Sequence, residues 1–245
     1  MRELVAAEWL KLRTTRLPYG MVGAAIGLAV AAVAGGVLAT ARSDTALTST
    51  RGLDQVLSLA GTGALVTLLT GILVAAGEYR HGTATDTFLT APRRHRVVIA
   101  KLAVGAALGL ATGLMTATTG LGTAAALFQM EGDTLPLGDG EVWLILAGTL
   151  GYATLFAVLG VALGTLIRNQ VLAVAVALAW IGIVEHILIS LAPGVGRWLP
   201  AMAGQAIVRT PIEDVLPPLG GLAVLTAYAV LIGVAGLRLA VSRDV

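Results

Sequence analysis

Six long apolar stretches constrain the fold of this chain more than any other feature of the sequence. They lie at about 17–40, 56–76, 97–128, 143–167, 171–192 and 219–240. Each is close to or above the ~20 residues with which a helix crosses a bilayer core of about 30 Å. The chain is 57% hydrophobic and 12% charged, whereas soluble domains are roughly a quarter charged. We therefore predict an all-α, polytopic integral membrane protein with six transmembrane helices in one domain, residues 1–245.

The loops between these stretches divide the positive charge unequally. Twelve of the sixteen Lys and Arg residues fall on the side that holds both termini. Because an excess of Lys and Arg marks cytoplasmic loops, we predict a multi-pass protein of the cell membrane with both termini in the cytoplasm. The basic residues gather at helix ends rather than on one face, so we expect contacts with the lipid bilayer and no nucleic-acid partner.

Residues 2–16 are predicted to form an amphipathic helix lying at the membrane surface. Its apolar side chains fall roughly on one side and most of its charges elsewhere, with Trp9 at headgroup level. The alternative is a disordered basic leader. The residues to which we assign the interfacial role are Glu8, Trp9, Lys11 and Arg13.

A charged segment, GEYRHGTATDTFLTAPRRHRVVIAK (77–101), separates the second and third apolar stretches. Gly82 is expected to break the preceding helix, and Thr83 followed by Asp86 resembles a helix N-cap with an acidic partner. Apolar residues then recur at helical spacing until Pro92 stops the element. We predict a short amphipathic helix over 83–91, flat at the cytoplasmic surface.

A positive-inside anchor without further function is the alternative for the same segment. Glu78 and Arg80, at the exit of the second stretch, are interpreted either as an ion pair, mutual or between helices, or as residues that fix the exit angle of the segment. Surface ion pairs usually contribute little to stability.

On the outer side, residues 193–218 are too apolar to be freely solvated and too short to cross the membrane. We expect a re-entrant or interfacial piece, because non-helical backbone at membrane depth must be shielded by protein. Glycines at four-residue spacing (Gly23/Gly27, Gly105/Gly109/Gly113 and Gly160/Gly164) suggest close helix packing inside the bundle or across a dimer.

Glu185 and His186 lie inside the fifth apolar stretch, where ionisable groups are costly and often functional. Three interpretations stay open: an outer cavity or substrate contact, proton transfer, or a structural pin for the outer segment. Ser190 follows His186 by four residues, yet neighbours on one helix are poorly placed for nucleophilic attack, so an intramembrane hydrolase is disfavoured.

The sequence contains no cysteine, and neither of its lysines, Lys11 and Lys101, follows a glycine. A phosphate-binding loop of the Walker A kind therefore cannot form, and we expect no nucleotide hydrolysis by this chain alone. The three histidines are not at metal-ligand spacing. We expect no catalytic residue, metal or bound cofactor.

With these residues in view, the sequence resembles the permease subunits of ABC-2 type ABC transporters, especially the compact six-helix kind common in actinobacteria. The likeness rests on the amphipathic start and on the apolar outer segment. It rests most on Glu78-Tyr79-Arg80-His81-Gly82-Thr83 followed by Thr87-Phe88-Leu89, Pro92, Arg93-Arg94 and Lys101. The residues that match the coupling-helix loop of that family are Glu78, Arg80, Gly82, Thr83, Asp86, Phe88, Leu89, Pro92 and Arg93.

The resemblance implies a complex of two permeases, identical or related, with two ABC ATPase subunits that hold ATP and magnesium. Helix 83–91 would transmit the movement of the ATPases, and export of a hydrophobic or amphipathic compound (drug, antibiotic or lipid-like) is expected. A gradient-driven carrier that uses Glu185 is the alternative function.

Overall fold

The computed structural model describes residues 1–80 and 94–242, and every regular element in those ranges is a helix. Six helical stretches there are long and apolar enough to cross a bilayer, which confirms the predicted all-α, polytopic membrane fold. The helices are α1 (Arg2–Thr14), α2 (Leu17–Ala41), α3 (Thr50–Leu57), η1 (Ser58–Thr62), α4 (Gly63–Arg80), α6 (Arg94–Met130), α7 (Gly140–Ile167), α8 (Gln170–Ala179), η2 (Trp180–Val184), α9 (Glu185–Leu191), α10 (Pro193–Gly196), α11 (Pro200–Ile207) and α12 (Pro218–Ser242).

Side-chain caps fix where several of these helices begin. The hydroxyl of Ser49 accepts a hydrogen bond from Gly52 N–H at 3.1 Å, so α3 begins at Thr50, ahead of the expected start at 56. Asp139 caps α7, and Asn169 caps α8 through Leu172 N–H. Such caps satisfy N–H groups that have no partner inside the helix.

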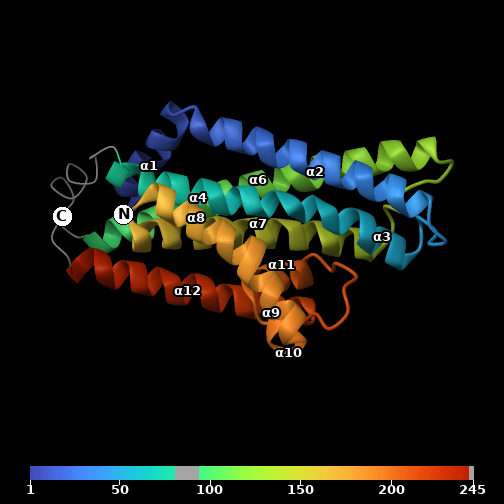
Figure 1. Ribbon diagram of the computed structural model, residues 1–245. Helices are drawn as coiled ribbons and strands as arrows, with labels where there is room; N and C mark the ends of the chain where they lie inside the picture. Colours follow the sequence, from blue (N-terminus) through green and yellow to red (C-terminus); the bar gives the residue numbers. More distant parts are fainter. Residues whose placement is uncertain (81–93, 243–245) are drawn as a thin grey trace.

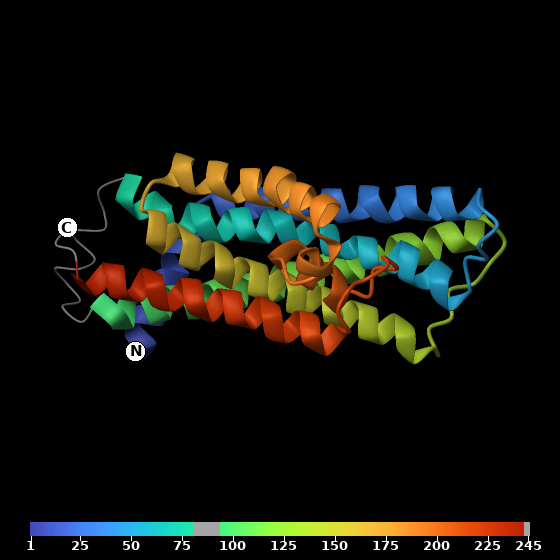
Figure 2. The same ribbon diagram turned by 60° about the horizontal axis from the view of Figure 1, so that its bottom comes forward.

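Helix α7 occupies the centre of the bundle, with α4, α6 and α12 packed against it (Figures 1 and 2). Small residues permit this close approach. A side chain at Gly160 of α7 would collide with the carbonyl oxygen of Leu68 on α4, and one at Gly109 of α6 would meet the backbone of Thr154 on α7. The central helix is therefore held by backbone contacts on two sides.

The three glycine series behave differently from one another. The series of Gly105 faces α7 and that of Gly160 faces α4, so both pack inside the chain. Gly23 and Gly27, by contrast, have no atom within 4 Å of the position of an added Cβ, and both are exposed on α2. Close packing within the chain thus explains two of the series and leaves that of α2 open.

The start of α1, the end of α12, the end of α4 and the start of α6 share one end of the bundle (Figure 1); we call this the terminal end. Helices α2, α3, α6 and α7 reach farthest toward the opposite, distal end. The 37 residues of α6 correspond to about 55 Å of helix. This length exceeds the ~30 Å of a bilayer core, so α6 is long enough to tilt or to project beyond it.

The outer segment folds back toward the middle of the bundle instead of forming an extended loop. Helices α10 and α11 lie about halfway along α7 (Figures 1 and 2), and α11 packs against α12 and α7. Ala203, Gly204 and Ile207 of α11 are buried, and a side chain at Gly204 would collide with the ring of Tyr152. This short buried helix lies within residues 193–218, for which a re-entrant or interfacial position in the membrane stays a prediction.

Candidate functional site

Four charged side chains from three helices meet at the terminal end. Lys101 of α6 donates to Glu8 of α1 (Nζ–Oε2, 2.8 Å) and pairs with Glu78 in the last turn of α4 (Nζ–Oε1, 2.5 Å). Lys11 lies one turn after Glu8, with its Nζ 2.9 Å from Glu8 Oε1 and 2.9 Å from Glu78 Oε1. We call Glu8, Lys11, Glu78 and Lys101 the ion cluster.

Most of the ion cluster is buried. The side chains of Lys101, Glu8 and Glu78 are 4%, 7% and 12% exposed. An unpaired charge at such a place would lose several kcal/mol of hydration, but two ammonium groups here balance two carboxylates. Burial lowers the pKa of Lys11, yet the hydrogen bonds and charges of Glu78 and Glu8 outweigh burial and raise that pKa above its ordinary value. Lys11 therefore stays charged at physiological pH.

The local sequence explains why these groups meet. Glu8 and Leu12 lie one turn apart and are the buried residues of α1, which packs on α6. Lys101 lies among the buried residues Val97, Val98 and Val104 of α6. The cluster thus joins α1 to the last turn of α4 and to the first part of α6.

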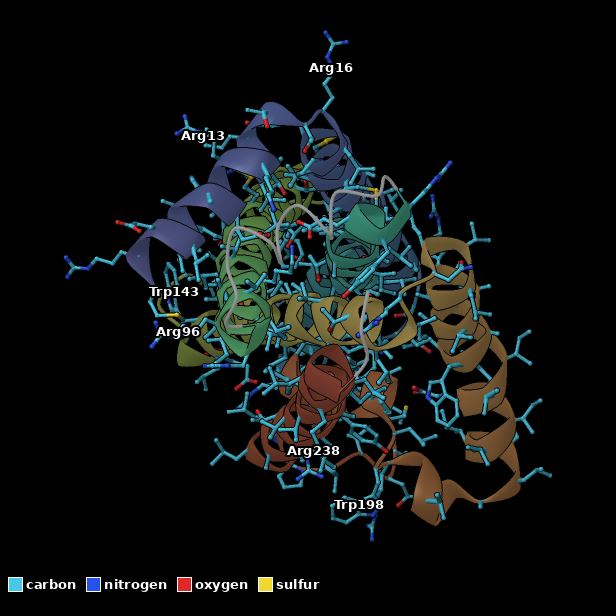
Figure 3. The ribbon with its side chains drawn as sticks, turned by 90° about the vertical axis from the view of Figure 1, so that its left-hand side faces the viewer. Arg13, Arg16, Arg96, Trp143, Trp198 and Arg238 are labelled. Atoms are coloured by element: carbon cyan, nitrogen blue, oxygen red, sulfur yellow. The ribbon has the colours of Figure 1, made fainter. Side chains whose placement is uncertain are left out.

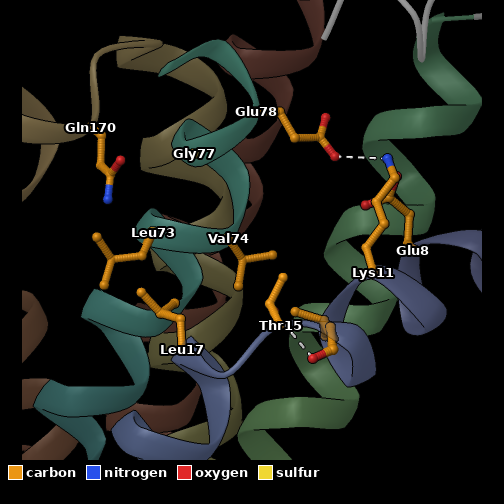
Figure 4. A pocket seen from close by; sticks show the side chains of 10 residues that line it. Glu8, Lys11, Thr15, Leu17, Leu73, Val74, Gly77, Glu78 and Gln170 are labelled. Carbon is orange, nitrogen blue, oxygen red and sulfur yellow. Dashed lines mark hydrogen bonds and ion pairs between the residues drawn. The ribbon is translucent and has the colours of Figure 1, made fainter. Parts of the chain in front are cut away.

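A cavity of about 440 Å³ adjoins the ion cluster (Figure 4). Lys11 and Glu78 stand at one side of it, and Leu17, Leu73 and Gln170 at the other. The cavity opens between α1, α2, α4 and the start of α8. One wall of the cavity is charged and the other is largely apolar.

The turn between α7 and α8 closes onto the end of α4. The Arg168 guanidinium carbon stands 5.4 Å from the centroid of the Tyr79 ring, and Arg168 Nη2 donates to the carbonyl of Leu239 at 2.8 Å. Arg80 Nη1 lies 3.5 Å from Gln170 Oε1. Arg168 thereby links α4, α7 and α12 beside the ion cluster.

The structure brings together some residues singled out from the sequence. Of the predicted coupling residues, Glu78 pairs with lysines of α1 and α6, and Arg80 faces α8. Trp9 and Arg13 are exposed on α1, whereas Glu8 is on its buried face. The predicted helix 83–91 lies outside the described residues, as do Gly82, Thr83, Asp86, Phe88, Leu89, Pro92 and Arg93.

Lys101 ends the segment that resembles the coupling-helix loop, but the sequence interpretation assigned it no role as a site residue. A signal was present, because Lys101 follows Val97-Val98-Ile99-Ala100 inside an apolar run. A lysine at such a position needs an acidic partner. The identity of that partner was hidden, since Glu8 stands 93 positions earlier.

Glu185 lies apart from this cluster, at the start of α9, and is fully buried. Its Oε2 accepts a hydrogen bond from the Ala201 N–H of α11 at 2.9 Å. Its Oε1 has no hydrogen-bond partner in the described part of the chain. Glu185 follows the π-helix η2, a form that often accompanies functional sites.

His186 is exposed, and its Nδ1 lies 3.0 Å from the carbonyl oxygen of Ile181. The Ser190 hydroxyl donates to the backbone carbonyl of His186 rather than to its ring. The two side chains are therefore not arranged as a nucleophile and a base. Within residues 1–80 and 94–242, no three His, Asp or Glu side chains group to hold a metal ion.

Together the fold and the ion cluster define a polytopic helical membrane protein whose terminal end is tied by buried charges. Comparison with known families matches residues 4–184 to the family described as ABC-2 family transporter protein. The chain belongs to this family, whose members are membrane components of transporters. A comparison with curated proteins returned no match.

Proposed function

We propose that this chain is the permease subunit of an ABC exporter driven by a separate ATPase. The observation that carries the proposal is the ion cluster. Its member Glu78 lies five residues before Thr83, where the predicted coupling helix begins. A helix over 83–91 that docks on an ATPase would be connected through this cluster to α1, α4 and α6 at once. Rotation of the ATPase would then tilt three helices together.

The assembly we propose contains two permeases, identical or related, and two ATPases that hold ATP and magnesium. The terminal end faces the cytoplasm of a cell whose plasma membrane holds the complex. The excess of Lys and Arg at that end supports this orientation. The transported compound is hydrophobic or amphipathic, which agrees with spans that contain few charged residues.

Glu185 serves in this proposal as a structural pin between α9 and α11. Its hydrogen bond to Ala201 N–H supports this role. The unpaired and buried Oε1 favours the second candidate, a gradient-driven carrier in which Glu185 exchanges a proton. Two measurements separate these candidates. A pin tolerates Glu185→Gln, whereas a proton carrier stops transporting in this variant. The unmodified protein transports without any ATPase only if it is the carrier.

Co-purification tests the main proposal. An ABC ATPase that co-purifies with the wild-type chain from its native membranes is first identified. Its association and ATP hydrolysis are then compared for wild type, Phe88→Asp and Gly82→Pro. We expect both variants to lose association or stimulation of hydrolysis. Leu137→Asp is the matched control, since Leu137 is 51% exposed in the turn before α7 at the distal end. Unchanged association and hydrolysis in both test variants would show that 83–91 does not couple the subunits.

A further inference from the structure

A second cavity, of about 350 Å³, forms a groove on the exterior of the helix bundle, in the half that includes the terminal end. Helix α7 supplies its floor, and α6 and α12 its walls. Nearly every lining side chain is apolar. The residues on which the argument depends are Ile99 and Leu102 of α6, Leu155 and Val158 of α7, and Val230 and Val234 of α12.

The length of the groove along α12 is close to the thickness of one membrane leaflet. On α12 it runs from Thr226 to Leu237, which corresponds to about 16 Å at 1.5 Å per residue. The hydrocarbon core of a bilayer is about 30 Å thick, so the groove extends over roughly half of it. Ile99, Val230 and Val234 are 44%, 55% and 43% exposed, and the groove is therefore open along its side.

Two arginines flank the groove where it reaches the terminal end. Arg238 follows Leu237 and continues the face of Val230 and Val234 at four-residue spacing, and Arg96 stands one turn before Ile99. Figure 3 shows Arg96 beside α6 and Arg238 beside α12, both on the outside of this end. Among the described residues, neither guanidinium has an ion-pair or hydrogen-bond partner.

We propose that this groove binds a phospholipid with an anionic headgroup, with one acyl chain between α6 and α12 and the phosphate at Arg96 and Arg238. The groove is complementary to such a lipid in shape, because it is apolar and about as long as one leaflet is thick. It is complementary in charge, because two unpartnered guanidinium groups lie at its end. Arginine is well suited to phosphate because its planar group presents several donors. The site is independent of ATPase coupling.

Native mass spectrometry of the purified full-length chain in neutral detergent tests the proposal, with dioleoylphosphatidylglycerol and dioleoylphosphatidylcholine as probes. We expect the wild type to retain more phosphatidylglycerol than phosphatidylcholine. The double variant Arg96→Gln/Arg238→Gln should reduce this preference roughly thirtyfold, because two basic residues at about 1 kcal/mol each near an anionic lipid sum to about 2 kcal/mol. Arg42→Gln/Arg51→Gln removes the same charge at the distal end and should behave as the wild type. An unchanged preference in the first double variant would overturn the proposal.

A groove-filling variant tests the apolar part separately. The nearest atom to a Cβ at Gly233 is Leu102 Cδ1 at 3.9 Å, so Gly233→Leu can enter the groove without a backbone clash. We expect it to reduce retention of both lipids several-fold, whereas Gly122→Leu, at an open position of α6, should not. Equal retention in both leucine variants would place the lipid elsewhere and refute the groove.

Two further outcomes also contradict the site. If inorganic phosphate alone raises the thermal stability as much as phosphatidylglycerol does, the arginines bind a free anion and not a lipid. The chain has no cysteine, so Val230→Cys provides a single thiol at the edge of the groove. Disulfide-linked dimers of this variant in phosphatidylglycerol vesicles would show that a second copy covers the groove.

Discussion

Lys101 Nζ lies 2.8 Å from Glu8 Oε2, although 93 positions separate the two residues in the sequence. Both side chains are almost fully buried. This contact fastens the surface helix α1 to the long helix α6 and includes Glu78 at the end of α4. The helices that border the predicted coupling segment are thereby joined through charge rather than through apolar packing alone.

The first prediction concerns this pair. Lys101→Met should lower the free energy of unfolding by about 3–5 kcal/mol, because two carboxylates then share Lys11 alone in a buried place. Thermal unfolding in detergent measures the effect, with Arg13→Gln as an exposed control. The conservative variant Lys101→Arg keeps a positive charge between Glu8 and Glu78 and should lose less stability than Lys101→Met. If Lys101→Met is as stable as the control, the cluster does not hold these helices.

The pin at Glu185 leads to a second prediction. Glu185→Ala leaves the Ala201 N–H without its acceptor and should destabilise the protein by about 1–3 kcal/mol. Glu185→Gln keeps an acceptor oxygen and should be less affected. Limited proteolysis of the segment between α9 and α12 reports the release of α11. Equal proteolysis of wild type and Glu185→Ala would contradict the pin.

Close packing at the central helix gives a third prediction. Gly160→Ala would place a methyl group against the backbone of Leu68, and the forced separation of α4 and α7 should cost about 1–3 kcal/mol. Gly27→Ala makes the same change at an open position of α2 and should leave the monomer unaffected. Similar melting temperatures for the two variants would argue against the tight α4–α7 contact.

The turn after α7 supplies a fourth prediction. Arg168 has a φ of 55°, in the left-handed region, which is unfavourable for residues other than glycine. Arg168→Ala loses the contacts with Leu239 and Tyr79 and keeps the backbone strain, whereas Arg168→Gly loses the contacts but relieves the strain. Thermal unfolding should therefore rank Arg168→Gly above Arg168→Ala. The opposite order would indicate that the strain is negligible.

The sequence was sufficient to predict the helical membrane class, because a run of ~20 apolar residues by itself indicates a transmembrane helix. It did not reveal the start of the second span at Thr50, since Arg51 and Asp54 resemble loop residues until the cap at Ser49 is seen. Three-dimensional placement of α11 beside Tyr152 was equally hidden.

The candidate site was predicted only in part, for a physical reason. Glu78 and Arg80 were identified by their position at a helix exit, a local property. The pairing of Glu8 with Lys101, the groove over α7 and the link from Arg168 to Leu239 each join residues far apart in the sequence. Only the packing of the helices determines such contacts.

Cross-linking from a single cysteine tests the central claim most directly, because the chain contains no other thiol. Thr87→Cys places a cysteine within 83–91, and Gly138→Cys places one in the distal turn before α7. Both variants are co-expressed with the ATPase and treated with a short thiol–amine cross-linker in membranes. We predict an ATPase adduct from position 87 and none from position 138. An adduct from position 138 alone, or none from position 87 while the complex is intact, would contradict the account.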